Sequence, residues 1–242
     1  MYLKFLSTEH IDFVLQDGTL VVSSLQYFRK LEETRGPWIG DRLEGASELV
    51  TPSNFTLTER SPELERINQA DIGSGMFAGQ FAAINNGGKI EIANVSFVHQ
   101  LAPLFIYSFS NGELPEMKTR MCVEAQEPYD ACLQILDPAV LAQAICDSGE
   151  TSDGQPFRAQ FIGIRHEPVR YEAVSQNIMS ANAIPPSPFR KAPHFSLQRE
   201  ERFVLVPKSD IDLGIDRITI RIPNPSKYFE EVFRGNNSSD LR

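Results

Sequence analysis

Phe189–Val206 reads FRKAPHFSLQREERFVLV, and it joins a charged, aromatic stretch to an apolar, strand-like tail. A Pro-rich run from Ile184 to Pro188 precedes it. Gln198 and Glu200 are two residues apart, so their side chains share one face if the chain is extended. An amide beside a carboxylate on one face suits a site that grips and polarises a ligand. For an isolated Gln-x-Glu, the alternative is a solvated charged edge that leads into a strand.

The N-terminal region predicts a strand, a helix and a second strand. Tyr2 to Leu6 alternates apolar and polar side chains, as a half-buried strand does. A helix is expected from Thr8 to Gly18, because Ser7 or Thr8 can cap it and Gly18 can end it. Thr19 to Ser24 is then the second strand, and Leu25 to Glu33 is a further helical turn or two.

Most of the remaining pattern is strand-like. Asp137 to Cys146 predicts a helix with Asp137 as N-cap and Pro138 at its first position, and Tyr228 to Phe233 predicts a terminal helix. Because strands outnumber helices and alternate, the sequence predicts an α+β fold with a mixed, mainly antiparallel sheet and a few packed helices. The expected strands are Lys89–Val98, Pro103–Ser110, Asp130–Leu136, Phe157–Tyr171, Arg202–Pro207 and Arg217–Ile222.

The composition is that of an ordinary globular protein, with 242 residues, of which 41% are hydrophobic and 23% charged. One domain spanning 1–242 is expected, with 235–242 as a frayed tail. The net charge of -9 argues against general nucleic-acid or membrane-surface binding, because phosphate groups require a basic surface. No signal peptide or membrane-spanning run is present, so a soluble, cytoplasmic protein is expected.

Metal and nucleophile chemistry leave weak signals. No Cys or His pair has the spacing of metal ligands, and no Gly-x-Ser-x-Gly, phosphate-loop or dinucleotide-binding motif occurs. On a strand, His166 and Glu167 would lie on opposite faces. The three cysteines, Cys122, Cys132 and Cys146, are expected to be reduced and mostly buried, and burial disfavours the thiolate that a cysteine nucleophile needs.

Ser108 and Ser110 occupy alternate positions on an otherwise bulky strand. Their hydroxyls would therefore share a face, where they could brace another polar group. The alternative is two serines that ease the strand into its turn.

The loop around Trp38, the only tryptophan, also holds Asp41, Arg42 and Glu44. Loops that carry aromatics and carboxylates often carry function. An ion pair between Asp41 and Arg42 that pins the loop explains the pattern equally well.

Motifs spread over most of the chain resemble a broad family of uncharacterised bacterial and phage proteins. These motifs are Tyr2-Leu3-Lys4-Phe5, Ser23–Phe28, Gly40–Gly45, Phe109-Ser110, Phe189-Arg190-Lys191 and Gln198-x-Glu200-x-Arg202. The same pattern is similar to mono-ADP-ribosyltransferases. In that family a first-strand Arg or His, a Ser-x-Ser strand and a Gln/Glu-x-Glu strand entry surround NAD.

The resemblance implies an ADP-ribosyltransferase-like fold, NAD as a substrate and a macromolecular acceptor of unspecified identity. Glu200 would hold the nicotinamide ribose and stabilise an oxocarbenium-like transition state, a role in which a fixed carboxylate contributes several kcal/mol. Gln198 would orient the acceptor, and Ser108 and Ser110 would brace Glu200. Lys4 and Tyr27 are further candidate contacts to NAD. The biological role implied is that of a toxin or a phage–host conflict factor.

Two alternatives stand beside this hypothesis. The first strand offers Lys4 or Tyr2 and lacks the Arg or His of the family, which favours a non-enzymatic protein-binding module that acts through the Trp38 loop. A metal-dependent nuclease that uses Asp41, Glu44 and Glu200 is the second, and the acidic balance speaks against it. Arg202 is the residue most able to make the motif structural, as an ion-pair partner of Glu200.

Overall fold

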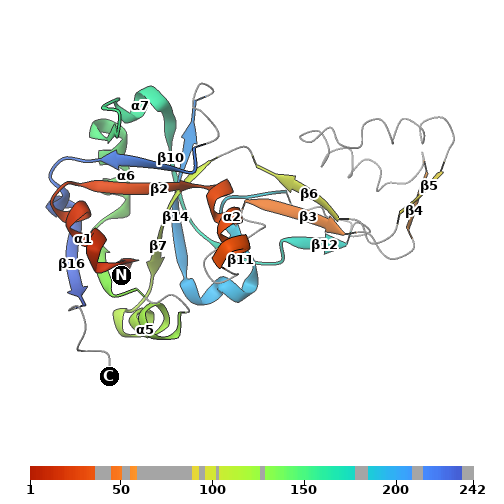
Figure 1. The fold of residues 1–242 in the computed structure, drawn as a ribbon, viewed down its shortest axis with the longest axis horizontal. Helices are drawn as coiled ribbons and strands as arrows, with labels where there is room; N and C mark the ends of the chain where they lie inside the picture. Colours follow the sequence, from red (N-terminus) through yellow and green to blue (C-terminus); the bar gives the residue numbers. More distant parts are fainter. Residues whose placement is uncertain are drawn as a thin grey trace. The chain divides into compact units, whose positions relative to one another are not determined.

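The structure is a computed structural model, and it describes residues 1–35, 45–50, 55–58, 89–92, 96–101, 104–125, 129–177, 185–208 and 215–235. It is an α+β fold with mainly antiparallel strands, as predicted (Figure 1). The chain divides into two compact units. The first comprises Met1–Arg42, Pro103–Tyr171 and His194–Arg242, and the second comprises Leu43–Ala102 and Glu172–Pro193.

The first unit contains a sheet in which nine strands of the described residues take part. Its main path runs β16-β8-β1-β7-β2-β15-β9, while β14 pairs with β7 and β10 pairs with β14. Each of these neighbouring pairs is antiparallel. The strands are β1 (Tyr2–Leu6), β2 (Thr19–Ser24), β7 (Phe105–Asn111), β8 (Ala131–Ile135), β9 (Glu150–Thr151), β10 (Phe161–Pro168), β14 (Glu200–Pro207), β15 (Arg217–Arg221) and β16 (Phe229–Arg234).

Strand β7 is the branch point of this sheet. One of its edges pairs with β14 from Ser110 to Phe105. The other edge pairs with β1 through Ser110 and Asn111, and with β2 through Phe105 and Ile106. Residues 107–109 therefore lie between the ends of the two pairings, at the point where β1 and β2 diverge.

Local signals explain the start of α6 and the end of α1. Asp137 caps α6, because its carboxylate accepts hydrogen bonds from the backbone N–H groups of Ala139 and Val140 at 2.8 and 3.1 Å. Gly18 follows α1 at φ +65°, and a Cβ there would lie 2.0 Å from the Ile222 carbonyl oxygen, so only glycine fits. The helices are α1 (Thr8–Leu15), α2 (Leu25–Arg35), α5 (Leu114–Thr119), η2 (Arg120–Glu124), α6 (Pro138–Ser148), α7 (Phe157–Gln160), η3 (Pro193–Gln198) and η4 (Pro225–Lys227).

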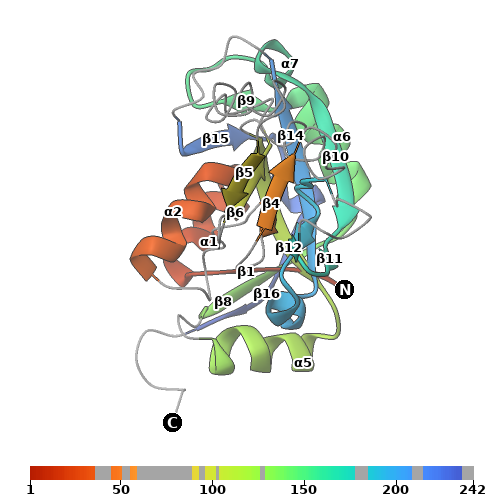
Figure 2. The same cartoon turned by 90° about the vertical axis from the view of Figure 1, so that its right-hand side faces the viewer.

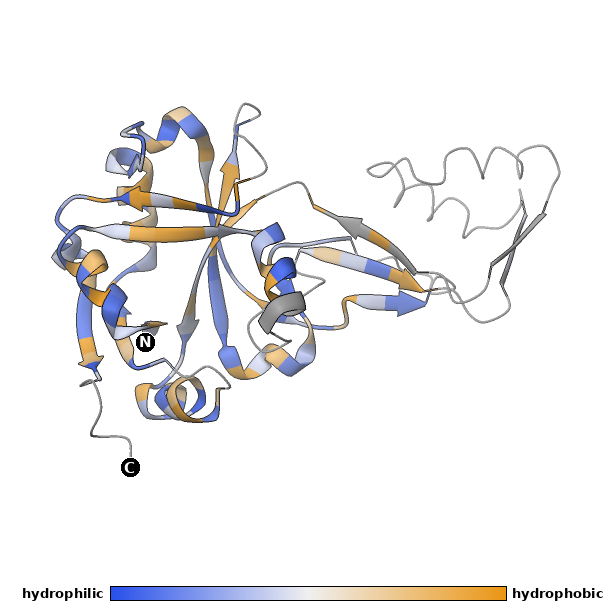
Figure 3. Cartoon of the chain, in the orientation of Figure 1, coloured by the Kyte–Doolittle hydropathy of each residue, from blue (hydrophilic) through white to orange (hydrophobic). Residues whose placement is uncertain are grey.

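Alternate residues of β1 enter two different hydrophobic cores. Leu6 belongs to the main core, which also contains Phe109 and Phe203. Leu3 and Phe5 belong to a second core. Along β14 the side chains change from hydrophilic at the end where the strand begins to hydrophobic further along (Figure 3). Polar chemistry is therefore concentrated at the first residues of β14.

The second unit has a three-stranded sheet and a separate strand pair (Figure 2). In the sheet, β3 (Ala46–Val50) pairs antiparallel with β6 (Ser96–Gln100) and parallel with β12 (Ser175–Asn177). The pair consists of β4 (Phe55–Thr58) and β5 (Lys89–Ile92), and the unit also holds β13 (Arg190–Lys191).

Three sequence predictions of secondary structure are wrong in part or in full. Tyr228–Phe233 is not a helix, because β16 pairs with β8 and gains backbone partners that a six-residue helix lacks. Phe157–Gln160 is helical, so the predicted strand begins only at Phe161. Lys89–Val98 is divided between β5 and β6, which pair with different strands.

Candidate functional site

The first residues of β14 form a polar group, which we call the Glu200 cluster: Ser108, Glu200 and Arg202. The Ser108 hydroxyl donates a hydrogen bond to Glu200 Oε1, and Arg202 Nε donates to the same oxygen at 2.7 Å. Ser110 pairs with Glu200, and Ser108 pairs with Arg202, so all four side chains lie on one face of β7 and β14. The prediction that Ser108 and Ser110 share a face is confirmed.

The Glu200 cluster is almost fully enclosed. Glu200 is 7% exposed and Arg202 only 1%. Guanidinium stays charged in proteins, so Arg202 favours the ionised form of the carboxylate beside it. Removing either partner of such a pair leaves a buried charge, which is strongly destabilising. The contact between Arg202 and Glu200 therefore fixes the position of the carboxylate and also stabilises the fold.

The backbone around Glu200 is held on several sides. Its N–H donates to the Tyr171 hydroxyl at 2.6 Å, and its carbonyl accepts from the Val169 N–H at 2.9 Å. Arg199, which precedes it, has φ +42°, a conformation in which side-chain-bearing residues are uncommon. The Arg199 guanidinium lies 3.0 Å from the Glu116 carboxylate. These contacts fix the direction in which the Glu200 side chain leaves the strand.

Gln198 does not share a strand face with Glu200, which corrects the sequence prediction. Gln198 ends the 3-10 helix η3, and Arg199 in its left-handed conformation turns the chain before β14 begins. The periodicity of two that would align the residues applies only to extended chain.

Lys4 reaches β7 at the point where β1 and β2 diverge. Its Nζ donates to the Ser108 carbonyl at 2.7 Å and lies 4.6 Å from the centre of the Tyr107 ring. Burial lowers the pKa of Lys4 to about 8, and the charge of Glu200 partly opposes that shift. Lys4 lies between Leu3 and Phe5, so its side chain leaves β1 on the main-core face, opposite to theirs.

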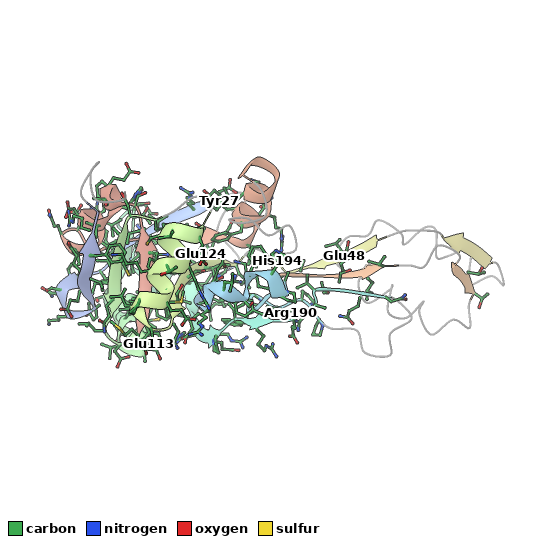
Figure 4. The ribbon with its side chains drawn as sticks, turned by 90° about the horizontal axis from the view of Figure 1, so that it is seen from below. Tyr27, Glu48, Glu113, Glu124, Arg190 and His194 are labelled. Carbon is green, nitrogen blue, oxygen red and sulfur yellow. The ribbon has the colours of Figure 1, made fainter. Side chains whose placement is uncertain are left out.

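Tyr27 lies on α2, and its contacts lead to β15. Its ring lies 4.1 Å from the Arg217 guanidinium carbon and packs edge-on against Phe28 (Tyr27 is labelled in Figure 4). Its backbone N–H donates to the Ser24 hydroxyl. Hydrogen bonds connect Ser108 with both Lys4 and Glu200, whereas Tyr27 contacts Ser24, Phe28 and Arg217.

A second polar group, which the sequence reasoning missed, consists of Asn111, His166 and Glu201; we call it the His166 group. His166 Nε2 lies 2.6 Å from Glu201 Oε2, and Asn111 Nδ2 donates to Glu201 Oε1 at 2.6 Å. Glu201 leaves β14 on the face opposite to that of Glu200. The Glu-Glu doublet was the only local signal, because His166 and Glu201 are 35 residues apart and meet through strand pairing.

Other candidate chemistry finds less support in the described part of the chain. No group of three His, Cys, Asp or Glu side chains that could hold a metal ion occurs there. Cys122 and Cys132 are buried as predicted, and burial raises the pKa of the Cys132 thiol to about 12, which disfavours the nucleophilic thiolate. Trp38, Asp41 and Glu44 lie outside the described residues.

No helix among the described residues has the length and apolar character needed to cross a membrane. Comparisons with protein-family models, with curated proteins and with solved structures found no match to this chain.

Proposed function

We propose that this protein is an ADP-ribosyltransferase-like enzyme that uses NAD, with Glu200 as its catalytic carboxylate. The observation that carries the proposal is the hydrogen bond from Ser108 to Glu200, which is the contact that the resemblance implies for these two residues. It joins residues that are 92 positions apart in the chain, so neither local sequence nor local structure requires it.

The order of strands also supports the proposal. The three strands that carry the resemblance, β1 with Lys4, β7 with Ser108 and Ser110, and β14 with Glu200, are direct neighbours in the order β1-β7-β14. They are brought together from the beginning, middle and end of the chain. Lys4 supplies a cation next to the serine strand, at the position where the family carries Arg or His.

Each residue has a defined task in this proposal. When the bond between the nicotinamide nitrogen and the ribose breaks, positive charge develops on the sugar, and the Glu200 carboxylate stabilises it. Ser108 and Arg202 hold the Glu200 side chain in one orientation, which avoids reorganisation during the reaction. Nicotinamide leaves with the electron pair of the broken bond, the acceptor nucleophile forms the new bond to the same ribose carbon, and the proton of the acceptor passes to water. Lys4 leaves β1 on the other face of the sheet from Glu200, and it is assigned to holding the Ser108 backbone through its hydrogen bond to the Ser108 carbonyl.

Arg202 favours the second candidate function, a non-catalytic binding module of the same fold. A buried guanidinium against Glu200 reduces the negative field that a cationic transition state would meet. In that case the Glu200 cluster is a structural ion pair braced by Ser108, and the function resides elsewhere on the chain.

The experiment measures nicotinamide release and label transfer from labelled NAD in the presence of cell lysate. Wild-type protein, Glu200→Gln and the double variant Glu200→Gln/Arg202→Met are compared, with Glu231→Gln on β16 as a carboxylate control. The double variant removes both charges, so it avoids the uncompensated Arg202 that Glu200→Gln leaves behind. We expect it to fold and to lose at least about 100-fold in rate, the scale of one lost electrostatic stabiliser.

Two results contradict the proposal in different ways. A folded double variant that retains wild-type nicotinamide release would remove Glu200 from catalysis. Wild-type protein that neither releases nicotinamide nor shows a thermal shift with NAD, but binds a purified protein partner, would establish the binding module instead.

A further inference from the structure

The His166 group has the arrangement of a general base with its orienting carboxylate, on the opposite face of β14 from Glu200. His166 lies on β10 and is paired with Phe203, while Glu201 is paired with Phe109 and Pro168. The imidazole ring is 5.2 Å from the ring of Phe203 and 5.6 Å from that of Phe109, centre to centre. Two aromatic rings and one carboxylate thus determine the orientation of this histidine.

Both oxygens of Glu201 are used within the group. Oε2 accepts from His166 and Oε1 accepts from Asn111. The Glu201 side chain is 11% exposed, so its charge is shielded from water and cannot easily turn towards other partners. A carboxylate held in this way fixes which ring nitrogen of its histidine carries the proton.

The other ring nitrogen of His166 has no hydrogen-bond partner among the described residues. With Nε2 donating to Glu201, the neutral imidazole has its lone pair on Nδ1, and no residue of the described ranges forms a hydrogen bond with Nδ1. The His166 side chain is 27% exposed, more than twice the exposure of Glu201. The proton-accepting nitrogen therefore belongs to the more accessible member of the pair.

A purely structural role for the pair of His166 and Glu201 does not explain why polar residues occupy these two positions. Such pairs often contribute little to stability compared with apolar residues of similar volume. Here apolar packing is already provided by Phe109 and Phe203, yet β10 and β14 carry a histidine and a glutamate beside them.

We propose that His166 is the general base of a second site, which takes a proton from a hydroxyl group, water included, of a bound ligand. Nδ1 accepts the proton, the oxygen of the hydroxyl forms a bond to the carbonyl carbon of an ester, and the bond between that carbon and the alcohol oxygen of the ester breaks. Glu201 stabilises the imidazolium that results, and the proton passes from Nδ1 to the leaving group. Asn111 acts as a positioning residue, because it fixes the second oxygen of Glu201. This assignment is independent of NAD and of Glu200.

The test uses p-nitrophenyl acetate as a probe ester. At His166, water gives a proton to Nδ1, its oxygen bonds to the acetyl carbon, and the bond to p-nitrophenol breaks, so that acetic acid and p-nitrophenol form. His10 provides the matched control, because it is an exposed histidine 3.5 Å from a carboxylate, that of Glu9, without a buried partner.

We expect His166→Gln to reduce p-nitrophenol release at least about tenfold, and His10→Gln to leave it close to wild type. Glu201→Gln keeps a hydrogen-bond acceptor but removes the charge, and we expect a loss of about 10-fold to 100-fold, as for other residues that orient a functional histidine. The wild-type rate should fall in D2O, because a proton moves in the step. Equal losses in His166→Gln and His10→Gln, or an unchanged rate in Glu201→Gln, would overturn the proposal.

A measurement on the wild-type chain covers the case in which these variants do not fold. Diethyl pyrocarbonate modifies the unprotonated nitrogen of histidine, and mass spectrometry of the peptides gives the rate at each position. We expect His166 to be modified, although it is about half as exposed as His10. The absence of modification at His166 under conditions that modify His10 would mean that Nδ1 is not accessible and would refute the site.

Discussion

Glu200 and Glu201 are neighbours in the chain, but their carboxylates lie in opposite kinds of environment. Glu200 meets a permanently charged arginine that is 1% exposed, whereas Glu201 meets a histidine that is 27% exposed. Both carboxylates are largely buried, and Glu200 accepts hydrogen bonds from Ser108 and Arg202 as Glu201 does from His166 and Asn111. Their difference lies in the partner.

The partner decides which chemistry each carboxylate can support. A guanidinium cannot release its proton, so the Glu200 cluster offers a fixed negative charge and no proton transfer. An imidazole accepts and releases protons near neutral pH, so the His166 group suits proton transfer and not static charge stabilisation. Because side chains alternate along β14, the Glu200 cluster lies on one face of this strand and the His166 group on the other.

The largest effect is expected for Arg202→Met. This change leaves the Glu200 carboxylate buried without its cation, and we expect unfolding free energy to fall by about 3 to 5 kcal/mol. Urea denaturation measures it, and Glu200→Gln/Arg202→Met should regain most of the loss. On the other face, His166→Gln should cost less, because the imidazole is partly exposed and Glu201 keeps Asn111. A loss in Arg202→Met no greater than that in His166→Gln would remove the distinction between the two faces.

Lys4 connects the two faces electrostatically. Its pKa is lowered from 10.5 to about 8 in the folded protein, so between these values the unfolded chain binds more protons than the folded one. Lys4 therefore contributes a rise of stability with pH over this window, by about 3 kcal/mol at most, and the cost of burying the charged amine is present below pH 8. Lys4→Met should remove this contribution, measured as the difference between wild-type and variant denaturation curves from pH 7 to 10.5, because the buried cysteines contribute equally to both.

Two further variants sharpen this test. Lys30→Met removes an exposed lysine that pairs with Asp216, and it should leave the slope unchanged. Glu200→Gln removes the charge that favours protonated Lys4, so it should lower the pKa of Lys4 further, as followed by NMR of the lysine side chain. A pKa of Lys4 that is unaffected by Glu200→Gln would show that the two faces are electrostatically separate.

The sequence predicted those parts of the molecule that depend on local signals. The α6 helix was expected because Asp137 and Pro138 form an N-terminal cap, and β1, α1 and β2 follow from short, unambiguous patterns. Ser108 and Ser110 were expected on one face because the periodicity of a strand is two. The same periodicity identifies which segments are strands, and therefore the fold class, but it does not give the order of the strands in the sheet.

The parts that could not be predicted depend on contacts between distant segments. His166 meets Glu201 only through the register of β10 with β14, and no local pattern encodes that register. Gln198 does not share a face with Glu200 because Arg199, between them, has a left-handed backbone conformation. Gly or Asn usually occupies such a position, so nothing in the sequence indicated it. A short pattern such as Phe229–Phe233 fits a helix or a strand. It forms a strand because its backbone pairs with the edge of β8.

The smallest effect is expected for Tyr171→Phe, which tests whether the Tyr171 hydroxyl helps to fix the backbone at Glu200. The change removes the acceptor of the Glu200 N–H and should cost about 1 to 2 kcal/mol, because a largely buried donor loses its partner. Amide exchange should accelerate at Glu200 and stay unchanged at Phe203, and Tyr228→Phe is the control for removal of a tyrosine hydroxyl. If Glu200 is catalytic, the rate of nicotinamide release falls while NAD binding is kept, since only the orientation of the carboxylate has loosened. Unchanged amide exchange at Glu200 would show that the Arg199 turn and the Val169 contact suffice to hold it.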